Sequence, residues 1–389
     1  MKTTRHRPDF ILFVVIVLLV LFGLVNIYSA STIVSLQIYG DTDAVFMRQL
    51  LWVFVGLFLM LFFMNFTYTR WQKLSKLLLP LSYLLLVMVF LPEPIGVLIN
   101  GAHRWVNLGI QFQPSDLAMF SIIVYLAYLL TRKQERILDP RASFWPPMVL
   151  IAAGFGLIML EPDMDTAVTY AACPFLLMFV AGVPFKYLRN TFIVGVAALV
   201  PLVFVGYRAA RIKSYLDPWN SVEHYGYQII QSLYAISTGG WTGRGLGHSI
   251  EKFSYLPEPH TDFIFAVLSE EWGFIGGAFL IVLYCILIWR GLQIATRVRD
   301  RFASLLAVGI TANVGIAVFL NIGSVTNLLP VIGVPLPFIS YGGTSLLVKL
   351  VAMGILLNVS RYTEQQAITE DKAPMRPQRP VAVPGPGAK

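Results

Sequence analysis

The residues best placed to do chemistry stand where a polar stretch of the chain gives way to a long apolar one. The sequence there reads Leu256-Pro-Glu-Pro-His-Thr-Asp262, and Phe-Ile-Phe-Ala-Val-Leu follows directly. A carboxylate at a boundary with lipid is costly, so a functional role is the default expectation. Partial loss of hydration would raise the pKa of Asp262 toward neutrality, which suits a general base. The alternative is that Asp262 only caps the helix that follows.

The neighbours of Asp262 extend this candidate site. Glu258 and His260 precede it in the same polar stretch, and we expect both to contact the substrate. Glu270 lies two helical turns further on, about 12 Å along the axis, too far to pair directly with Asp262. We expect Glu270 to anchor a buried polar network. Small residues recur along this helix and predict close packing inside a bundle: Ala266, Ser269, Gly273 and Gly276.

Two further segments carry polar or helix-breaking residues. Arg104 and Trp105 end the run Asn100-Gly-Ala-His-Arg-Trp, and they either bind a sugar phosphate or anchor the loop at the membrane interface. After three prolines the chain reads Ser340-Tyr341-Gly342-Gly343. Irregular backbone at membrane depth is tolerated where it lines a cavity or is buried in protein. We therefore expect these four residues to contribute to a binding site.

Charged residues inside apolar stretches need partners. Lys349 lies within the last apolar segment, and the internal acids Asp116, Asp163 and Asp165 are its candidate partners. With Glu161 and Glu270, the residues Asp116, Asp163 and Lys349 are assigned to structural polar networks. Four other cations suit a phosphate or pyrophosphate headgroup, with lipid snorkelling as an equally weighted alternative: Arg48, Arg208, Arg211 and Lys213.

Composition places the chain in a membrane. Its 389 residues are 57% hydrophobic and 13% charged, with a mean hydropathy of +0.69. Soluble domains carry about 25% charged residues. The two cysteines, Cys173 and Cys285, both lie in apolar runs, which indicates small core residues rather than a disulfide or a metal site.

Apolar segments of about 20 residues predict an all-α, polytopic protein with about ten membrane-spanning helices. The loop 208–262 separates the seventh span from the eighth, and the tail 362–389 is rich in proline and predicts disorder. Residues 1–361 then form one membrane domain. The expected spans are 10–30, 45–64, 74–92, 115–131, 146–162, 165–182, 187–207, 263–289, 303–323 and 344–360.

Lysine and arginine positions predict the orientation. With the N-terminus in the cytoplasm, 21 of the 29 basic residues lie on the cytoplasmic side and seven on the outside. Both termini are then cytoplasmic, and Asp262 and the loop 208–262 face outward. The net charge of +8 is therefore mainly an orientation signal, and it gives little support for nucleic-acid binding.

The longest motifs resemble the SEDS family, the shape, elongation, division and sporulation proteins of bacterial cell-wall synthesis. The resemblance covers residues 8–361. Its most specific parts are Leu256 to Glu271 and Leu329 to Ser345, with Gly101-Ala-His-Arg-Trp, Phe112-Gln-Pro-Ser-Asp, Glu161-Pro-Asp and Tyr227-Gln-Ile-Ile-Gln-Ser in support. The segment Ile355 to Arg361 is more similar to the division and sporulation branch (FtsW, SpoVE) than to the elongation branch (RodA).

The resemblance implies particular roles and also shows three departures. The essential acid of the family corresponds to Asp262, and its loop tryptophan corresponds to Trp105. The family's usual glutamate and lysine in the fourth span are replaced here by Asp116 and Met119, and a glycine is replaced by Asp165. A role for that lysine therefore cannot be transferred to this chain.

What the resemblance implies is a peptidoglycan glycosyltransferase in the bacterial cytoplasmic membrane. It would polymerise lipid II, release undecaprenyl pyrophosphate, and work beside a class B penicillin-binding protein among divisome or elongasome membrane proteins. The resemblance establishes no cofactor; a divalent cation, Mg or Mn, could assist the pyrophosphate, but the sequence contains no dedicated metal cage. Two alternatives remain open: a lipid II flippase, and a scaffold without chemistry that recruits a transpeptidase.

Overall fold

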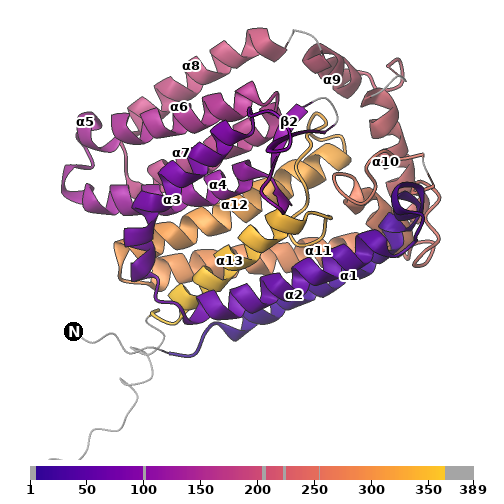
Figure 1. Cartoon of the computed structure of the whole chain (residues 1–389), viewed down its shortest axis with the longest axis horizontal. Helices are drawn as coiled ribbons and strands as arrows, with labels where there is room; N and C mark the ends of the chain where they lie inside the picture. The colour runs from indigo at the N-terminus through magenta and orange to yellow at the C-terminus, as the bar shows by residue number, and fades with distance from the viewer. Residues whose placement is uncertain (1–5, 100–101, 204–206, 222–224, 254, 364–389) are drawn as a thin grey trace, which may run out of the picture.

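The computed structural model describes residues 6–99, 102–203, 207–221, 225–253 and 255–363. The chain is mainly helical, as predicted, with one small sheet added (Figure 1). Its elements are α1 (Phe10–Tyr39), α2 (Ala44–Asn65), α3 (Thr69–Met88), β1 (Gly96–Ile99), β2 (Ala102–Asn107), β3 (Gln111–Phe112), α4 (Pro114–Arg132), a 3₁₀ turn (Gln134–Arg136), α5 (Pro140–Ser143), α6 (Trp145–Leu160), α7 (Met164–Ala181), α8 (Phe185–Val203), α9 (Tyr207–Leu216), α10 (Tyr225–Gly239), α11 (Ile264–Arg297), α12 (Arg301–Val325) and α13 (Gly343–Ser360).

Eight helical segments in the described part of the chain are long and apolar enough to cross a membrane: α1, α2, α4, α5 with α6, α7, α11, α12 and α13. The helices α3 and α8 occupy the third and seventh predicted spans but are not among these eight. The count of ten spans therefore stays a prediction. The predicted corner between the fifth and sixth spans is confirmed, since α6 ends at Leu160 and α7 begins at Met164.

The bundle is built around α12. This helix contacts α4, α7, α11 and α13, and so it joins the group of α3, α4, α6 and α7 to the group of α1, α2, α11 and α13 (Figure 1). Within these groups α13 packs mainly on α2, and α3 packs on α4. The apolar side chains of these helices form one continuous buried core.

Both ends of the described chain meet at one end of the bundle, which we call the terminal face. Asp9 caps α1 by accepting a hydrogen bond from the backbone N–H of Leu12 at 2.9 Å, and Arg290 of α11 pairs with the Asp9 carboxylate. The backbone N–H of His6 donates to the carbonyl of Arg361. Tyr362, which the sequence assigns to the tail, packs on the ring of Tyr68. Residues 364–389 of the predicted tail lie outside the described residues.

The opposite end, the loop face, carries the connecting segments. Between α3 and α4 the strands pair in the antiparallel order β1-β2-β3. The predicted loop 208–262 contains two short helices, α9 and α10. In Figure 1 the strands and α10 gather at the same end of the bundle, away from the marked N-terminus.

Helix α11 is broken at Gly273, which corrects the expectation that Gly273 belongs to a continuous helical face. Its φ of 66° and ψ of −166° are non-helical and are readily available only to glycine. The glycine-rich loop after α10 fills the break: the N–H of Phe274 donates to the carbonyl of Gly240, and the N–H of Gly245 donates to the carbonyl of Glu271. A Cβ at Gly273 would lie 2.3 Å from the nitrogen of Gly243, so the contact requires glycine.

Candidate active site

A polar cavity of about 360 Å³ opens near the loop face, and Asp262 forms part of its wall. It lies among the start of α4, strand β2, the start of α7, the segment before α11, α12, the α12–α13 connection and the first turns of α13. Its lining includes nine residues that the sequence assigns to substrate binding, catalysis or polar networks: Arg104, Trp105, Asp116, Asp163, Glu258, Asp262, Tyr341, Gly342 and Lys349.

The backbone around Asp262 is fixed by a buried amide. The side-chain nitrogen of Asn321 in α12 donates to the carbonyl of Asp262 and to that of Val334, each at 2.8 Å. The N-cap position of α11 belongs to Phe263, and no side chain caps this helix. The capping alternative for Asp262 is therefore wrong, and its carboxylate stays directed at the cavity rather than at the helix.

Burial raises the pKa of Asp262 to about 7. The carboxylates of Glu258, Asp165 and Asp163 add to this rise because they disfavour a further negative charge, and Arg211 opposes it. This is the direction that the sequence predicts for a base at a lipid boundary. A pKa near the working pH suits a proton acceptor, because the ionised form is populated and is still basic enough to take a proton.

The acids of the α6–α7 corner are held from two sides. Asp163 caps α7 through the N–H and the hydroxyl of Thr166, and the side chain of Arg104 lies 3.6 Å away. Arg104 also donates to the carbonyl of Pro162 at 2.8 Å, so it ties β2 to this corner. Burial raises the pKa of Glu161 to about 9, and neither of its carboxylate oxygens has a hydrogen-bond partner in the described part of the chain. Burial without a donor thus favours the protonated form of Glu161.

Asp165 pairs with Arg211, a cation that the sequence predicts to bind the phosphate of the substrate. The guanidinium of Arg211 in α9 donates to both oxygens of Asp165, at 2.9 and 2.7 Å, and the N–H of Gly333 donates to Asp165 at 3.1 Å. A Cβ at Gly333 would lie 3.3 Å from a carboxylate oxygen of Asp262 and 3.5 Å from one of Asp165. Asp165, which stands where the SEDS pattern has a glycine, thus anchors α9 beside Asp262.

Lys349 reaches an acid through a hydroxyl. Its ammonium donates to Ser345 at 2.6 Å, and the hydroxyl of Ser345 donates to Asp116 at 3.1 Å. Of the three candidate partners, Asp116 is therefore the one that Lys349 reaches in this way, while Asp163 and Asp165 pair with arginines. Met119 lines the same cavity where the family usually has a lysine.

The segment before α13 supports the cavity wall. His260 packs its ring against Tyr341, with centroids 5.7 Å apart, and its carbonyl accepts a hydrogen bond from the N–H of Tyr341. The hydroxyl of Ser340 donates to the carbonyl of Thr261 at 2.6 Å. Gly343 starts α13 against the ring of Trp52. His260, Ser340 and Gly343 thus position the wall and do not line the cavity.

Two predicted phosphate-binding residues, Arg48 and Lys213, do not line this cavity. Arg48 donates to the hydroxyl of Tyr39 at 2.8 Å and lies over its ring, outside the cavity. Lys213 is exposed on α9 and does not line the cavity either. The side chain of Arg208 lies outside the described residues. Sequence reasoning assigned no role to several polar lining residues: Gln113, Ser115, Thr166, Thr169, Asn313 and Ser345. Gln113, Ser115 and Ser345 stand in the motifs quoted above, whereas the only signal for the other three was polarity within an apolar span.

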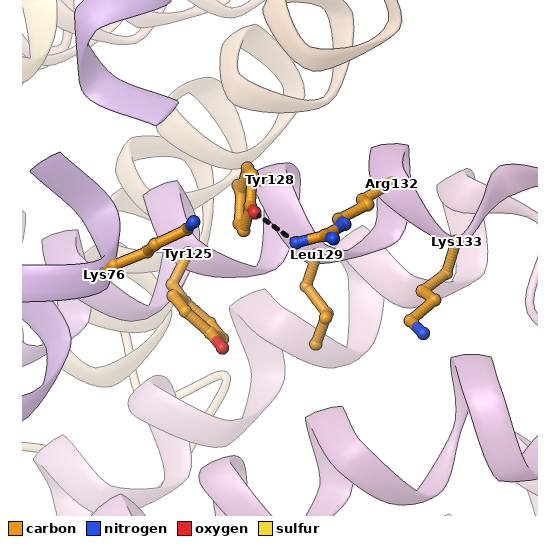
Figure 2. Close-up of a pocket in the computed structure, with 6 residues that line it drawn as sticks. All are labelled: Lys76, Tyr125, Tyr128, Leu129, Arg132 and Lys133. Atoms are coloured by element: carbon orange, nitrogen blue, oxygen red, sulfur yellow. Dashed lines mark hydrogen bonds between the residues drawn. The ribbon is translucent and has the colours of Figure 1, made fainter. Parts of the chain in front are cut away.

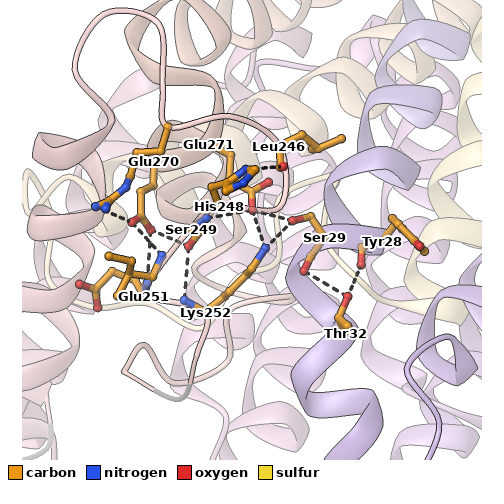
Figure 3. Close-up of polar contacts among 12 residues, drawn as sticks. Tyr28, Ser29, Thr32, Leu246, His248, Ser249, Glu251, Lys252, Glu270 and Glu271 are labelled. Atoms are coloured by element: carbon orange, nitrogen blue, oxygen red, sulfur yellow. Dashed lines mark hydrogen bonds and ion pairs between the residues drawn. The ribbon is translucent and has the colours of Figure 1, made fainter.

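Glu270 lies in a separate polar network behind the break in α11 (Figure 3). One of its carboxylate oxygens accepts from the hydroxyl of Ser249 at 2.5 Å, and the other accepts from the N–H of Ile250 at 2.9 Å. The guanidinium of Arg244 lies 3.6 Å away. Glu270 thus holds the loop 244–251 against α11.

The neighbouring Glu271 joins this loop to α1. One oxygen of Glu271 accepts from Lys252 at 2.8 Å and from the hydroxyl of Ser29 at 2.5 Å, and Lys252 also donates to Ser29 at 2.8 Å. Figure 3 shows Lys252 and Glu271 converging on Ser29. Lys252 and Glu271 are both almost fully buried. The sequence assigned a role to neither residue, although Glu271 ends the motif that begins at Leu256.

Within the described ranges, no three His, Cys, Asp or Glu side chains come together in a way that would hold a metal ion. The divalent cation that the sequence leaves open therefore stays a prediction without an assigned ligand set.

Comparisons with known proteins place these features in a family. Residues 9–365 match the family described as "Cell cycle protein", which comprises FtsW, RodA and SpoVE. The chain is 43% identical to stage V sporulation protein E of Bacillus subtilis over 365 residues, covering 93% of this chain and all of that protein. It is 39% identical to a probable peptidoglycan glycosyltransferase FtsW of a Geobacter species, covering 90% and 96% of the two chains.

Solved structures agree with this result. A chain from a structure described as "Structural coordination of polymerization and crosslinking by a peptidoglycan synthase complex" superposes with a TM-score of 0.73 at 30% identity, covering 91% of this chain and 98% of that one. The rod shape determining protein RodA of Thermus thermophilus gives 0.68 at 29% identity, covering 92% and 98%. The protein is thus a polytopic integral membrane protein, and the chain belongs to the SEDS family, on its FtsW and SpoVE branch.

Proposed function

We propose that this protein is a peptidoglycan glycosyltransferase that polymerises lipid II into β-1,4 glycan strands and releases undecaprenyl pyrophosphate. Several relatives that match this chain over nearly their whole length are named probable peptidoglycan glycosyltransferase. The observation that carries the chemical assignment is Asp262, an acid with a pKa of about 7 in the wall of a polar cavity. We assign it as the general base.

The reaction needs such a base. The 4-hydroxyl of an acceptor sugar has a pKa far above 7, so it must lose its proton as it attacks. Asp262 takes this proton while the hydroxyl oxygen bonds to the anomeric carbon of the donor. The bond from that carbon to the pyrophosphate oxygen breaks in the same step, and its electron pair leaves with undecaprenyl pyrophosphate. Attack from the opposite side inverts the α-linked donor and gives the β link.

The leaving pyrophosphate must be stabilised by cations. Arg104 and Lys349 line the cavity and are the cations that we assign to this role. Arg211 stands beside the cavity in its pair with Asp165 and can contribute through the field that it exerts on Asp262. Arg208 and Lys213 belong to the same helix α9, at the outer approach to the site.

The setting of the enzyme is part of the proposal. Residues 1–361 form a ten-span domain of the bacterial cytoplasmic membrane, with 208–262 as the outward loop between the seventh and eighth spans. The distribution of lysine and arginine supports cytoplasmic termini. A class B penicillin-binding protein is the proposed partner, in a divisome or an elongasome. Its support is the likeness to a chain of a peptidoglycan synthase complex.

The test is glycan assembly from purified lipid II by the protein co-purified with its transpeptidase partner. Asp262→Asn should keep the fold and the partner but polymerise at least about 10²-fold more slowly, and near-normal polymer from this variant would refute the assignment. Labelled lipid II supplied only to the outer face separates the alternatives. A polymerase elongates it, whereas a flippase or a scaffold yields no glycan.

A further inference from the structure

A second pocket, of about 510 Å³, lies between α3 and α4 (Figure 2). It is lined by Lys76, Tyr125, Tyr128, Leu129, Arg132 and Lys133. Arg132 ends α4, while Asp116 at the start of the same helix lines the cavity of Asp262. The 16 helical steps from Asp116 to Arg132 span about 24 Å at the helical rise. This pocket therefore lies at the terminal face, at the opposite end of α4 from the candidate active site.

The pocket gathers positive charge around a tyrosine. Arg132 donates to the hydroxyl of Tyr128 at 3.0 Å, and the ammonium of Lys76 lies 5.3 Å from the centre of the same ring. In Figure 2 the two cations point toward Tyr128 from opposite sides. Lys133 follows directly on α4 and lines the same pocket. Lys76 and Arg132 are exposed and Lys133 is half-buried, so water screens part of their repulsion and an anion bound among them would remove more of it.

No carboxylate of the described chain supplies that anion. Lys76, Arg132 and Lys133 form no ion pair there, whereas Asp163, Asp165, Glu270 and Glu271 each have a cationic partner. The pocket lining contains no acid at all. The charge in this pocket is thus left for a ligand from outside the chain.

The position of the pocket selects the chemical class of that ligand. Half-buried tyrosines at the end of a membrane helix lie at the level of lipid headgroups. Arginine binds phosphate oxygens with a fork of donors, and basic pockets between membrane helices bind acidic headgroups. Leu129 adds an apolar wall against which an acyl chain can pack. We propose that this pocket is a binding site for the phosphodiester headgroup of an anionic phospholipid.

The proposal is independent of the function of the Asp262 cavity, although the two sites share α4. A headgroup bound by Lys76 and Arg132 links α3 to α4 at the terminal face. Since α4 also carries Asp116 and Met119 into the other cavity, the lipid stabilises a helix pair that the active site uses. A bound lipid should therefore raise the melting temperature of the whole protein.

The experiment uses the full-length protein, stripped of lipid and titrated with cardiolipin, phosphatidylglycerol or phosphatidylethanolamine in detergent, with bound lipid counted by native mass spectrometry. The triple variant K76Q/R132Q/K133Q should bind both anionic lipids at least about tenfold more weakly, since each cation near a charged headgroup contributes measurably to binding. Phosphatidylethanolamine should bind weakly to parent and variant alike.

The matched control is K186Q/R189Q/R297Q, which removes three exposed cations of the same face outside the pocket. It should bind anionic lipid within about twofold of the parent. Equal loss in both triple variants would show a general charge effect and overturn the site, as would unchanged binding in K76Q/R132Q/K133Q. The single variants R132Q and K133Q repeat the measurement if the triple variant does not fold, and unchanged binding in both would equally overturn it.

A free anion is separated from a lipid by a further titration. Inorganic phosphate should leave the melting temperature of the parent unchanged at concentrations where phosphatidylglycerol raises it. If phosphate alone stabilised the parent but not K76Q/R132Q/K133Q, the ligand would be a soluble anion and the lipid assignment would be wrong.

Discussion

Asp262 and Glu270 lie eight residues apart on either side of the start of α11, yet the fold treats these two acids in opposite ways. Glu270 is fully buried, but both of its oxygens accept hydrogen bonds, and Arg244 lies beside it. Among the residues that the structure describes, none donates to the carboxylate of Asp262 and other acids lie near it, so burial and repulsion raise its pKa. The comparison shows that Glu270 holds a loop in place, whereas the carboxylate of Asp262 is available to accept a proton.

The physical reason is the cost of leaving charge unpaired. Hydrogen-bond donors and a cation compensate the cost of burying a carboxylate, whereas burial among other acids favours the protonated form and raises the pKa. Perturbed acids of this second kind cluster at functional sites. The loop 240–252 supplies the partners of Glu270 and Glu271, while no segment in the described chain supplies them to the carboxylate of Asp262.

The largest effect should come from Asp262→Asn. It removes the proton acceptor without changing shape, so the rate of glycan polymerisation should fall by about 10²- to 10⁴-fold. Polymer length and rate on purified lipid II measure this. Glu270→Gln is the comparison variant: it should lower stability more than activity per folded molecule. A Glu270→Gln protein that folded normally but had lost its activity would erase the contrast between the two acids.

The next effect concerns the buried pair of Lys252 and Glu271. Glu271→Gln keeps the acceptor oxygen but leaves the Lys252 charge unpaired, which should cost about 3 kcal/mol of folding free energy. The melting temperature in detergent measures the loss. The double variant Lys252→Met with Glu271→Gln should recover part of it, because no buried charge then remains. A double variant less stable than Glu271→Gln would contradict this view of the network.

The pH dependence of the polymerisation rate should follow Asp262, which also contributes to the pH dependence of stability. Its pKa of about 7 means that the ionised base is lost as the pH falls through 7, so activity should drop about tenfold per unit below that point. Stability changes in the opposite sense: the folded state holds a proton that the unfolded chain releases near pH 4, so stability falls as the pH rises from about 4 to about 7. Rate profiles and melting temperatures across this range test both, with Asp262→Asn lacking this contribution to stability.

The smallest effect should come from Asp165→Gly, which restores the residue usual in the family. The pair with Arg211 is partly exposed, so its loss should cost about 1 kcal/mol or less. Hydrogen exchange of α9 should become faster while polymerisation changes less than tenfold. Asp165→Asn is the matched control, since it removes the charge but keeps a side chain. Unchanged exchange of α9 in both variants would show that Asp165 does not anchor that helix.

Residues with a strong local pattern were predictable from the sequence. The apolar runs gave the long helices and the corner at Glu161 to Asp163, because lipid requires about 20 apolar residues per span. Asp262 was identifiable from an acid placed directly before such a run. The strands at 96–112 and the helices α9 and α10 were not, because short polar segments carry weak periodicity.

Pairings between distant segments were beyond the sequence. Arg211 was assigned to substrate, but the fold brings it to Asp165, 46 residues earlier in the chain. Lys252 lies in a polar loop and reads as an exposed residue, but the fold buries it against Ser29 and Glu271. Gly273 reads as a packing residue, whereas its role depends on the loop that pairs with the break in α11.

The sequence alone determined that this protein crosses the membrane repeatedly, which family it resembles, and that Asp262 is costly where it stands. These properties follow from the hydration of single side chains and from the order of residues within short segments. The tertiary structure alone decided which charges are neutralised, because a partner can come from any segment that packs nearby. It gave partners to Glu270 and Asp165, brought Lys349 to Asp116 through Ser345, and left Asp262 with a raised pKa in the cavity wall.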